Sequence, residues 1–533
     1  MTAGAELAAV DVAIVAAYFI AVLAHGLWVG RGERDALDYF LAGRTLPWAL
    51  IGFSLYASNM SGASFVGLMG ASYAHGMVVF NYEWTAALVL IFFALFMAPV
   101  FLRTRLYTVP EYLERRFDAR SRYAYALFTV LTIMFIDTAG ALYAGGIVIT
   151  TAVPALELWQ ASAALALFAG VYTIFGGLKA VVVTDTVQAV IMIVGAAAIC
   201  VIGLDAVGGW DRLFEGLDAA RTRLVMPADD AFLPWPGIGG VVILGFYYWT
   251  LNQYFVQRML AARSLDDARR GALFGGLLKL PNVFLMIIPG MIAIQLFPDL
   301  DSPDRVFPAL AFELLPAGFR GLILTALVAA IMSSLDSALN AAASLVTMDF
   351  VRPLRPRTST RTLLVIGRVV TAVAMVVAAA YAPLIRDFGS LFQYFQSTLA
   401  YLVPPIVAVY FVGIFWRRAT ATGAFSALVS GLALGLTLFI LKEVTGVWSA
   451  VGLPDVHFTY MALLMCAFAA LVAAAVSLAG PAPPAAAVAE ATFRRADLGA
   501  GVPGAEPRPW YLDHRWQAAG LGLVMAGAIA AFW

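Results

Sequence analysis

Long apolar stretches alternate with short polar connections along the whole chain. Each stretch has at least 18 residues, which is enough for a helix to cross the hydrocarbon core of a bilayer. The pattern predicts fourteen such helices, at residues 8–29, 47–73, 78–102, 123–151, 157–175, 180–204, 236–257, 271–296, 317–349, 362–382, 388–414, 420–441, 457–480 and 515–533. The expected fold class is therefore an all-α integral membrane protein embedded in a lipid bilayer.

Polar residues interrupt two of these stretches. The ninth contains residues 333–337 (SSLDS), and the second contains residues 57–64 (ASNMSGAS). A polar group in hydrocarbon costs several kcal/mol unless something binds it. Two such breaks in separate stretches predict the midplane binding site of a secondary transporter, where hydroxyls and unwound carbonyls face a small cation. Sodium suits such oxygen ligands better than a transition metal, which calls for His or Cys.

A third irregular run, residues 245–252 (GFYYWTLN), lies in the seventh stretch, five spans after the break in the second. That spacing is what an inverted five-plus-five repeat requires. The predicted organisation is a peripheral N-terminal helix at 8–29, a first five-helix repeat at 47–204, a second at 236–414 and peripheral C-terminal helices at 415–533.

Composition and charge exclude several other classes of protein. Hydrophobic residues make up 62% of the chain, charged residues 12%, and the net charge is zero, so a nucleic-acid partner has no support. The two cysteines, Cys200 and Cys466, lie in apolar stretches and imply neither disulfides nor a metal site. Neither a soluble domain nor a catalytic constellation is visible, so an enzyme and an obligatory protein partner are not expected. The first stretch lacks the flanks of a removable signal peptide.

The positions of Lys and Arg predict the orientation in the membrane. With fourteen spans, one set of connecting loops carries 24 of these residues, including Arg258, and the opposite set carries 7. The positive-inside rule places the richer set in the cytoplasm. We therefore expect a multi-pass protein of the plasma, or inner, membrane with both termini on the extracytoplasmic side.

Five ionisable residues in or near the apolar stretches have competing interpretations. Glu83 is either a site residue or an interfacial acid beside aromatic residues, and Lys279 either serves the site or extends to the headgroups. Asp185 either supports the site or is a simple acidic residue near a helix start. Asp137 lies too deep for a purely structural role to be favoured, and Asp336 either assists a cation or bonds a neighbouring helix.

Many short motifs follow one another in the same order as in a known family. They are 57–62 (ASNMSG), 82–84 (YEW), 107–112 (YTVPEY), 176–180 (GGLKA), 184–188 (TDTVQ), 233–237 (LPWPG), 247–249 (YYW), 257–258 (QR), 278–281 (LKLP), 333–335 (SSL) and 347–349 (TMD). Between residues 38 and 416 the chain resembles the sodium:solute symporter family, and within it the sodium/glucose cotransporter group. The resemblance implies a LeuT-type five-plus-five inverted-repeat fold.

The resemblance also implies roles for individual residues. The family's sodium site maps onto the carbonyls of Ala57, Met60 and Ala330 and the hydroxyls of Ser333 and Ser334. Asp185 matches an aspartate that supports the sodium pathway. The family's sugar-binding positions map onto Asn59, Glu83, Lys279 and Gln396, and its inner aromatic gate maps onto Tyr248 and Trp249.

Three further sugar-contacting positions depart from the family pattern. Ser64 replaces a longer Gln or His, Ala86 replaces a polar residue, and Gly245 replaces Asn or Thr. These differences leave room for a sugar other than a common hexose, or for a polyol.

The expected function is sodium-coupled symport of a small neutral solute, a sugar or a polyol, with Na⁺ as the coupling ion. Two alternatives stay open: a sodium symporter for an amino acid or organic acid, and a membrane sensor that reuses the fold without transport. Intact Ser333, Ser334 and Asp185 favour transport. The sequence does not decide the solute, the sodium stoichiometry, the oligomeric state, or whether Asp137 and Asp336 are functional.

Overall fold

The computed structural model describes residues 8–29, 36–173, 178–388, 391–499 and 509–533. Within these ranges the regular structure is helical, with only two isolated β-bridges. The all-α prediction is therefore confirmed for the described residues. The longer helices are α1 (Ala9–Val29), α3 (Trp48–Asn59), α4 (Gly62–His75), α5 (Asn81–Phe92), α8 (Ala119–Thr132), α9 (Ala139–Ala152), α10 (Leu158–Thr173), α11 (Leu178–Ala206), α13 (Ile238–Phe246), α14 (Gln253–Leu260), α15 (Leu265–Lys279), α16 (Ile288–Leu296), α18 (Phe319–Leu345), α20 (Thr360–Tyr381), α21 (Leu391–Leu402), α22 (Pro404–Phe415), α23 (Ala421–Phe439), α25 (Phe458–Ala479) and α27 (His514–Ala531).

Eight helical runs in the described residues are long and apolar enough to cross a membrane, and the pair α21 and α22, bent by 49°, makes a ninth if it is one span. The runs are Gly62–Arg103, Ala119–Thr151, Val181–Ala206, Leu265–Leu296, Phe319–Leu354, Thr360–Arg386, Ala421–Val444 and Phe458–Ala479. The number is below fourteen partly because several predicted stretches are broken. The second stretch, for example, is divided between α3 and α4, and the seventh between α13 and α14.

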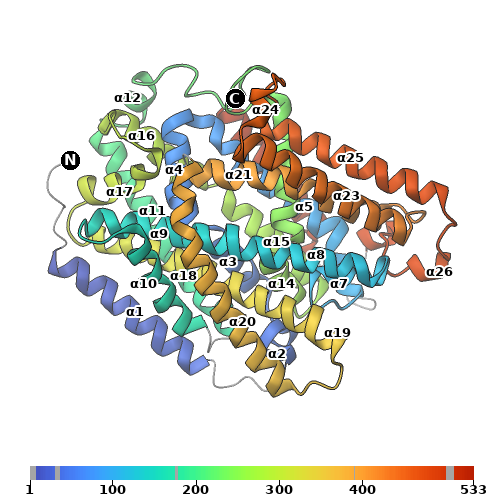
Figure 1. Cartoon of the computed structure of the whole chain (residues 1–533). Helices are drawn as coiled ribbons and strands as arrows, with labels where there is room; N and C mark the ends of the chain where they lie inside the picture. The colour runs from blue at the N-terminus through green and yellow to red at the C-terminus, as the bar shows by residue number, and fades with distance from the viewer. Residues whose placement is uncertain (1–7, 30–35, 174–177, 389–390, 500–508) are drawn as a thin grey trace.

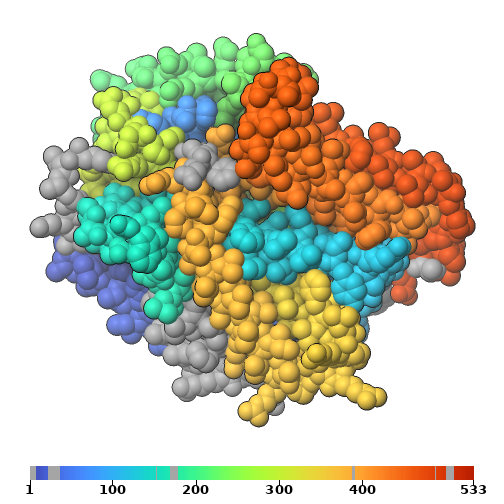
Figure 2. Space-filling view, viewed as in Figure 1, coloured from blue at the N-terminus to red at the C-terminus, as the bar shows by residue number. Residues whose placement is uncertain are grey.

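Helix α1 lies on one side of the molecule, and α23 and α25 lie on the other (Figure 1). Helix α1 packs against α18, whereas α23 and α25 pack against each other on the far side. Between them, α20 crosses the face seen in Figure 2, with α10 on one side and α8 on the other. Helices α3, α11, α15 and α18 form the centre, where α3 packs against α15 and α11 packs against α18.

Small residues allow α3 and α15 to approach each other closely. A Cβ atom on Gly52 of α3 would lie 2.3 Å from the Phe274 ring, and one on Gly271 of α15 would lie 2.6 Å from Ile51. Such contacts through small residues are typical of helix pairs in membranes, where packing rather than hydrophobic burial drives association. This contact fixes the distance between the two helices that carry Asn59 and Lys279.

Candidate functional site

The break between α3 and α4 frees backbone carbonyls for a ligand. Helix α3 ends at Asn59, and Met60 leaves helical geometry with φ −74° and ψ 68°. The Ser61 N–H, which would bond the Ala57 carbonyl in a continuous helix, bonds the Asn59 carbonyl instead (2.8 Å). Helix α4 then begins afresh at Gly62, with the Ser61 side chain as its N-cap. The Ala57 carbonyl therefore loses its helical partner in the part of the chain predicted to bind a cation.

Hydroxyl groups on α18 lie against this break. The Ser334 hydroxyl donates to the carbonyl of Ser58, at the end of α3 (3.2 Å), and to that of Ala330 (2.9 Å). The Ser333 hydroxyl donates to the Asp185 carboxylate (2.6 Å), so its lone pairs remain available to accept a cation. Neutral hydroxyl and carbonyl oxygens are ligands that suit a hard monovalent cation. The residues predicted for sodium thus fit that ion chemically.

A buried ion pair stands behind these serines. Arg258 of α14 lies 3.1 Å from the Asp185 carboxylate, and both side chains are almost fully buried. Arg258 also donates to Ser58 of α3 (2.6 Å) and to Ser337 of α18. The prediction that placed Arg258 in a cytoplasmic loop is therefore wrong, because α14 turns this side chain inward. The pair joins α14, α11, α3 and α18 next to the proposed cation ligands.

Lys279 and Glu83 form a second buried ion pair. The Lys279 ammonium contacts both the Glu83 carboxylate and the Asn59 side-chain oxygen. Asn282, one turn after Lys279, donates to the same carboxylate and accepts a hydrogen bond from Tyr56 (3.1 Å). Lys279 is 1% exposed, which excludes a side chain that extends to the headgroups. The buried ion pair with Lys279 likewise excludes an interfacial role for Glu83.

All seven residues predicted to bind the solute line one cavity of about 130 Å³: Asn59, Ser64, Glu83, Tyr248, Trp249, Lys279 and Gln396. The Trp249 ring lies 5.8 Å from the Lys279 nitrogen, within the range of a cation–π contact. Tyr248 and Trp249 belong to a π-helical segment, η7 (Tyr247–Leu251), that separates α13 from α14. The cavity thus combines a charged pair, two amides and an aromatic face. The structure brings these residues together, and their roles in binding stay predictions.

A larger cavity of about 440 Å³, which we call the vestibule, adjoins this one, because Phe392 and Gln396 of α21 line both. At the boundary the Phe392 ring packs edge-on against Tyr82 (centroids 4.9 Å apart). Phe232, from the connection before α13, packs against Phe392 and stacks on His75 at 3.8 Å. Phe392, which lines both cavities, therefore belongs to a cluster of aromatic side chains with Tyr82, Phe232 and His75.

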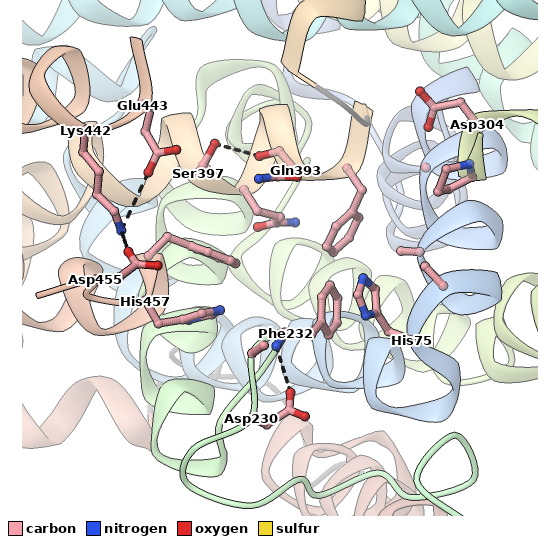
Figure 3. Close-up of a pocket in the computed structure, with 18 residues that line it drawn as sticks. His75, Asp230, Phe232, Asp304, Gln393, Ser397, Lys442, Glu443, Asp455 and His457 are labelled. Carbon is pink, nitrogen blue, oxygen red and sulfur yellow. Dashed lines mark hydrogen bonds and ion pairs between the residues drawn. The ribbon is translucent and has the colours of Figure 1, made fainter. Parts of the chain in front are cut away.

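Charged groups occupy the walls of the vestibule (Figure 3). Lys442 pairs with Asp455 (2.8 Å) on one side, and Asp304 lies on the other. The Asp304 carboxylate accepts from the Leu391 N–H (3.2 Å) and the Tyr143 hydroxyl (3.3 Å). Asp304 therefore ties the connection before α18 to the start of α21.

Sequence reasoning did not predict Phe392 in the walls of both cavities, Asn282 beside Glu83, or the inward direction of Arg258. The signal for Asn282 was available, since it follows Lys279 by three residues and so shares a helix face with it. Asp137 and Asp336, whose roles were left open, lie in different places. Asp336 is buried on α18, whereas Asp137 lies in η5 (Ile133–Thr138), the π-helical segment between α8 and α9.

The sequence model of the sodium:solute symporter family matches residues 39–431, which is well over half of the chain. The chain belongs to the sodium:solute symporter family. Among its relatives, sodium/glucose cotransporter 4 of Danio rerio is 36% identical over 89% of this chain and 79% of its own length. The sodium/glucose cotransporter of Vibrio parahaemolyticus is 34% identical over 80% and 85%, respectively. Sodium/myo-inositol cotransporter 2 of Oryctolagus cuniculus is 36% identical over 95% and 83%.

A solved structure shares the fold of this chain. A sodium-coupled sialic acid symporter, solved in a substrate-bound outward-open state, superposes with a TM-score of 0.78 at 22% identity and covers 89% of this chain. Membership of the sodium:solute symporter family confirms the predicted function, which is symport by a membrane-spanning protein with Na⁺ as the coupling ion. It also confirms that the chain is a transporter rather than an enzyme, because the family and these relatives are transporters.

Proposed function

We propose that this symporter uses sodium to import a sugar or a polyol. The observation that carries the proposal is the Lys279–Glu83 pair in a cavity shared with Asn59, Gln396 and an aromatic face. Each hydroxyl of a polyhydroxyl solute both donates and accepts, so it can use an ammonium, a carboxylate and amides together. The aromatic face suits the C–H surface of a sugar ring. The glucose and myo-inositol named for the relatives belong to this class of solute.

A carboxylate solute fits this cavity poorly. It would meet the Glu83 carboxylate in a medium of low dielectric, and the Lys279 ammonium that could offset the repulsion is already paired with that carboxylate. Arginine is the side chain best suited to bind a carboxylate through two parallel hydrogen bonds, and none lines the cavity in the described part of the chain. The buried Arg258 is engaged with Asp185 instead.

The entry of one sodium ion per solute molecule releases enough free energy to accumulate a neutral solute against its concentration gradient. One charge moving through 100 mV gains about 2.3 kcal/mol. A roughly tenfold sodium gradient adds about 1.4 kcal/mol. Together they support an accumulation of a neutral solute of about 500-fold. We propose that the carbonyls of Ala57, Met60 and Ala330 and the hydroxyls of Ser333 and Ser334 hold this ion, with Asp185 orienting Ser333.

We also propose the number of membrane spans, their division into repeats and their orientation in the membrane. Fourteen spans with a LeuT-type core would comprise repeats at 47–204 and 236–414, between peripheral helices at 8–29 and 415–533. Two irregularities at the equivalent place in each half support the repeats: the α3–α4 break and the η7 segment before α14. The excess of Lys and Arg in one set of loops supports extracytoplasmic termini and a location in the plasma, or inner, membrane.

Uptake into proteoliposomes tests the function directly. Vesicles with an inward sodium gradient and an inside-negative potential are given glucose, galactose, myo-inositol, proline or lactate. We expect sodium-dependent uptake of a sugar or of myo-inositol and none of proline or lactate. Uptake of only proline or lactate would refute the neutral-solute proposal.

The cation site is tested with a serine pair. Ser334→Ala removes a proposed ligand, so the sodium concentration for half-maximal uptake should rise at least tenfold. Ser430→Ala on α23 is the matched control, because its hydroxyl also bonds the carbonyl four residues earlier (2.6 Å) but lies on a peripheral helix. Unchanged sodium dependence in Ser334→Ala would remove Ser334 from the site.

A further inference from the structure

Helix α1 lies at one edge of the molecule (Figure 1), outside the two proposed repeats. It nevertheless packs against both helices behind the proposed cation site, namely α18, which carries Ser333 and Ser334, and α11, which carries Asp185. The site depends on these two helices together, because the Ser333 hydroxyl donates to the Asp185 carboxylate (2.6 Å). A helix that joins α11 to α18 can therefore control the geometry of that contact.

The start of α1 is fixed to the start of α18. The buried Asp11 carboxylate accepts from the N–H groups of Gly318 (2.7 Å) and Gly321 (2.8 Å). N–H groups at a helix start have no partner within the helix, and the N-cap residue Gly318 has no side chain to cap them. Asp11 thus supplies the cap of α18 from another helix. A Cβ atom on Gly321 would lie 2.6 Å from the Asp11 Cα, so the two backbones are in close contact.

Two turns further along α1, Tyr18 contacts both α11 and α18. The Gln188 side-chain amide of α11 donates to the Tyr18 hydroxyl (2.9 Å). The Tyr18 ring packs with Ala329 and Met332 of α18, each of which immediately precedes one of the proposed cation ligands. Tyr18 is 8% exposed and Gln188 is fully buried, so this bond is shielded from water.

Tyr18 joins the two helices close to the level of the cation site. Gln188 follows Asp185 by three residues, so the two side chains lie near one face of α11, about one turn apart. Helices α11 and α18 also touch at Gly195, where a Cβ atom would lie 2.9 Å from that of Ala326. That contact is almost three turns of α11 away from Asp185. The Tyr18 contact is therefore much better placed to hold the Asp185–Ser333 hydrogen bond in register.

We propose that Tyr18 is a positioning residue for the cation site. Through Gln188 it holds α11 against α18, so that Asp185 keeps the Ser333 hydroxyl oriented with its lone pairs available to sodium. This inference rests on the proposed cation site. Its consequence is that loss of the Tyr18 hydroxyl weakens sodium binding, although neither Tyr18 nor Gln188 is among the proposed ligands or lines the solute cavity.

Sodium binding without solute tests this role. It is measured from the rise in melting temperature as NaCl replaces choline chloride at constant total salt. Tyr18→Phe keeps the ring and its packing but removes the hydroxyl. The sodium dissociation constant should rise by about threefold to tenfold, which corresponds to one hydrogen bond. In uptake at saturating sodium, the half-saturating solute concentration should stay within twofold of wild type, which a general loss of structure would not allow.

Gln188→Met removes the other partner of the bond and tests whether Tyr18 acts through Gln188. Each single variant should weaken sodium binding, and the double variant should be no weaker than the weaker single variant, because the shared bond is lost only once. Tyr460→Phe is the matched control. Its hydroxyl bonds the Ala228 carbonyl (3.3 Å) from α25, on the other side of the molecule from α1, and this variant should keep the wild-type sodium constant.

The inference is overturned if Tyr18→Phe leaves the sodium dissociation constant within twofold of wild type, or weakens sodium and solute by a common factor. It is also overturned if the effects of Tyr18→Phe and Gln188→Met multiply in the double variant, since the two residues would then act separately. Ser334→Ala identifies failure of the underlying proposal. If that variant keeps the wild-type sodium constant, the proposed cation site is wrong, and the inference falls with it.

Discussion

The Lys279–Glu83 pair offers the sharpest test of how the cavity is built. Lys279 has 1% of its side chain exposed and Glu83 has 6%, so both charges have lost their water. Removing one partner of such a pair costs about 3–5 kcal/mol, because it leaves the other charge buried and uncompensated. Replacing both partners with neutral groups costs much less than the two single changes together. We therefore expect strong coupling between Glu83→Gln and Lys279→Met.

Thermal unfolding of the purified protein at fixed sodium measures this coupling. The single variants should lower the melting temperature markedly, and the double variant should recover a large part of the loss. The Arg115–Glu111 pair is the control, since Arg115 is 43% exposed and such helix pairs contribute about 0.3–0.5 kcal/mol. If the singles at Glu83 and Lys279 change stability no more than the same changes at Glu111 and Arg115, the pair is hydrated and the reasoning fails.

Solute binding should respond to the same change. A hydrogen bond to a charged group contributes about 1.5–3 kcal/mol. Loss of that bond in Glu83→Gln should therefore weaken binding of the transported sugar or polyol by about 10-fold to 150-fold. The Gln side chain retains an acceptor for Asn282, so that contact is kept although the protein is less stable. Sodium affinity in the absence of solute should be nearly unchanged, and an equal loss of both affinities would indicate misfolding instead.

Two further predictions concern other buried carboxylates. Arg258→Met should destabilise the protein by about 3–5 kcal/mol, because it leaves Asp185 unpaired. Adding Asp185→Asn should recover part of that loss in thermal unfolding. A double variant that is no more stable than the single variant would refute the coupling. Burial raises the pKa of Asp304 to about 6 from its ordinary 3.8, against the opposing hydrogen bonds from Leu391 and Tyr143. The folded state then binds more protons between about pH 4 and 6, so this group should lower stability by about 3 kcal/mol as pH rises through that window. Asp304→Asn should remove that slope from melting temperatures measured against pH, and an unchanged slope would contradict the assignment.

Much of the site could be predicted because its residues carry local signals. The polar runs around Asn59 and Ser334 stand out in apolar stretches, and the structure ends α3 at Asn59. The π-helical turn at Tyr248 lies within the run flagged for a broken helix. Such breaks depend on glycine, serine and asparagine in sequence, so local chemistry decides them.

The remainder depends on packing between distant segments. Arg258 follows an apolar stretch and has the sequence position of a loop arginine, and only the rotation of α14 directs it to Asp185. Phe232 reaches the boundary of the two cavities from a long connection whose path no periodicity predicts. The number of spans was also harder to predict than their existence, because a helix broken at Met60 gives one apolar stretch but two helices.

The position of Asn59 has a consequence for energy coupling. Its side chain contacts Lys279 in the solute cavity, while the neighbouring carbonyls of Ala57 and Met60 belong to the proposed sodium site. One short non-helical turn is therefore common to both ligands, and ordering it for one prepares it for the other. Thermodynamic reciprocity then requires that sodium tighten the solute by the same factor as the solute tightens sodium. Linked sites typically have a coupling free energy of about 1–3 kcal/mol. This turn alone connects the two sites, so no other path through the protein is needed for that coupling.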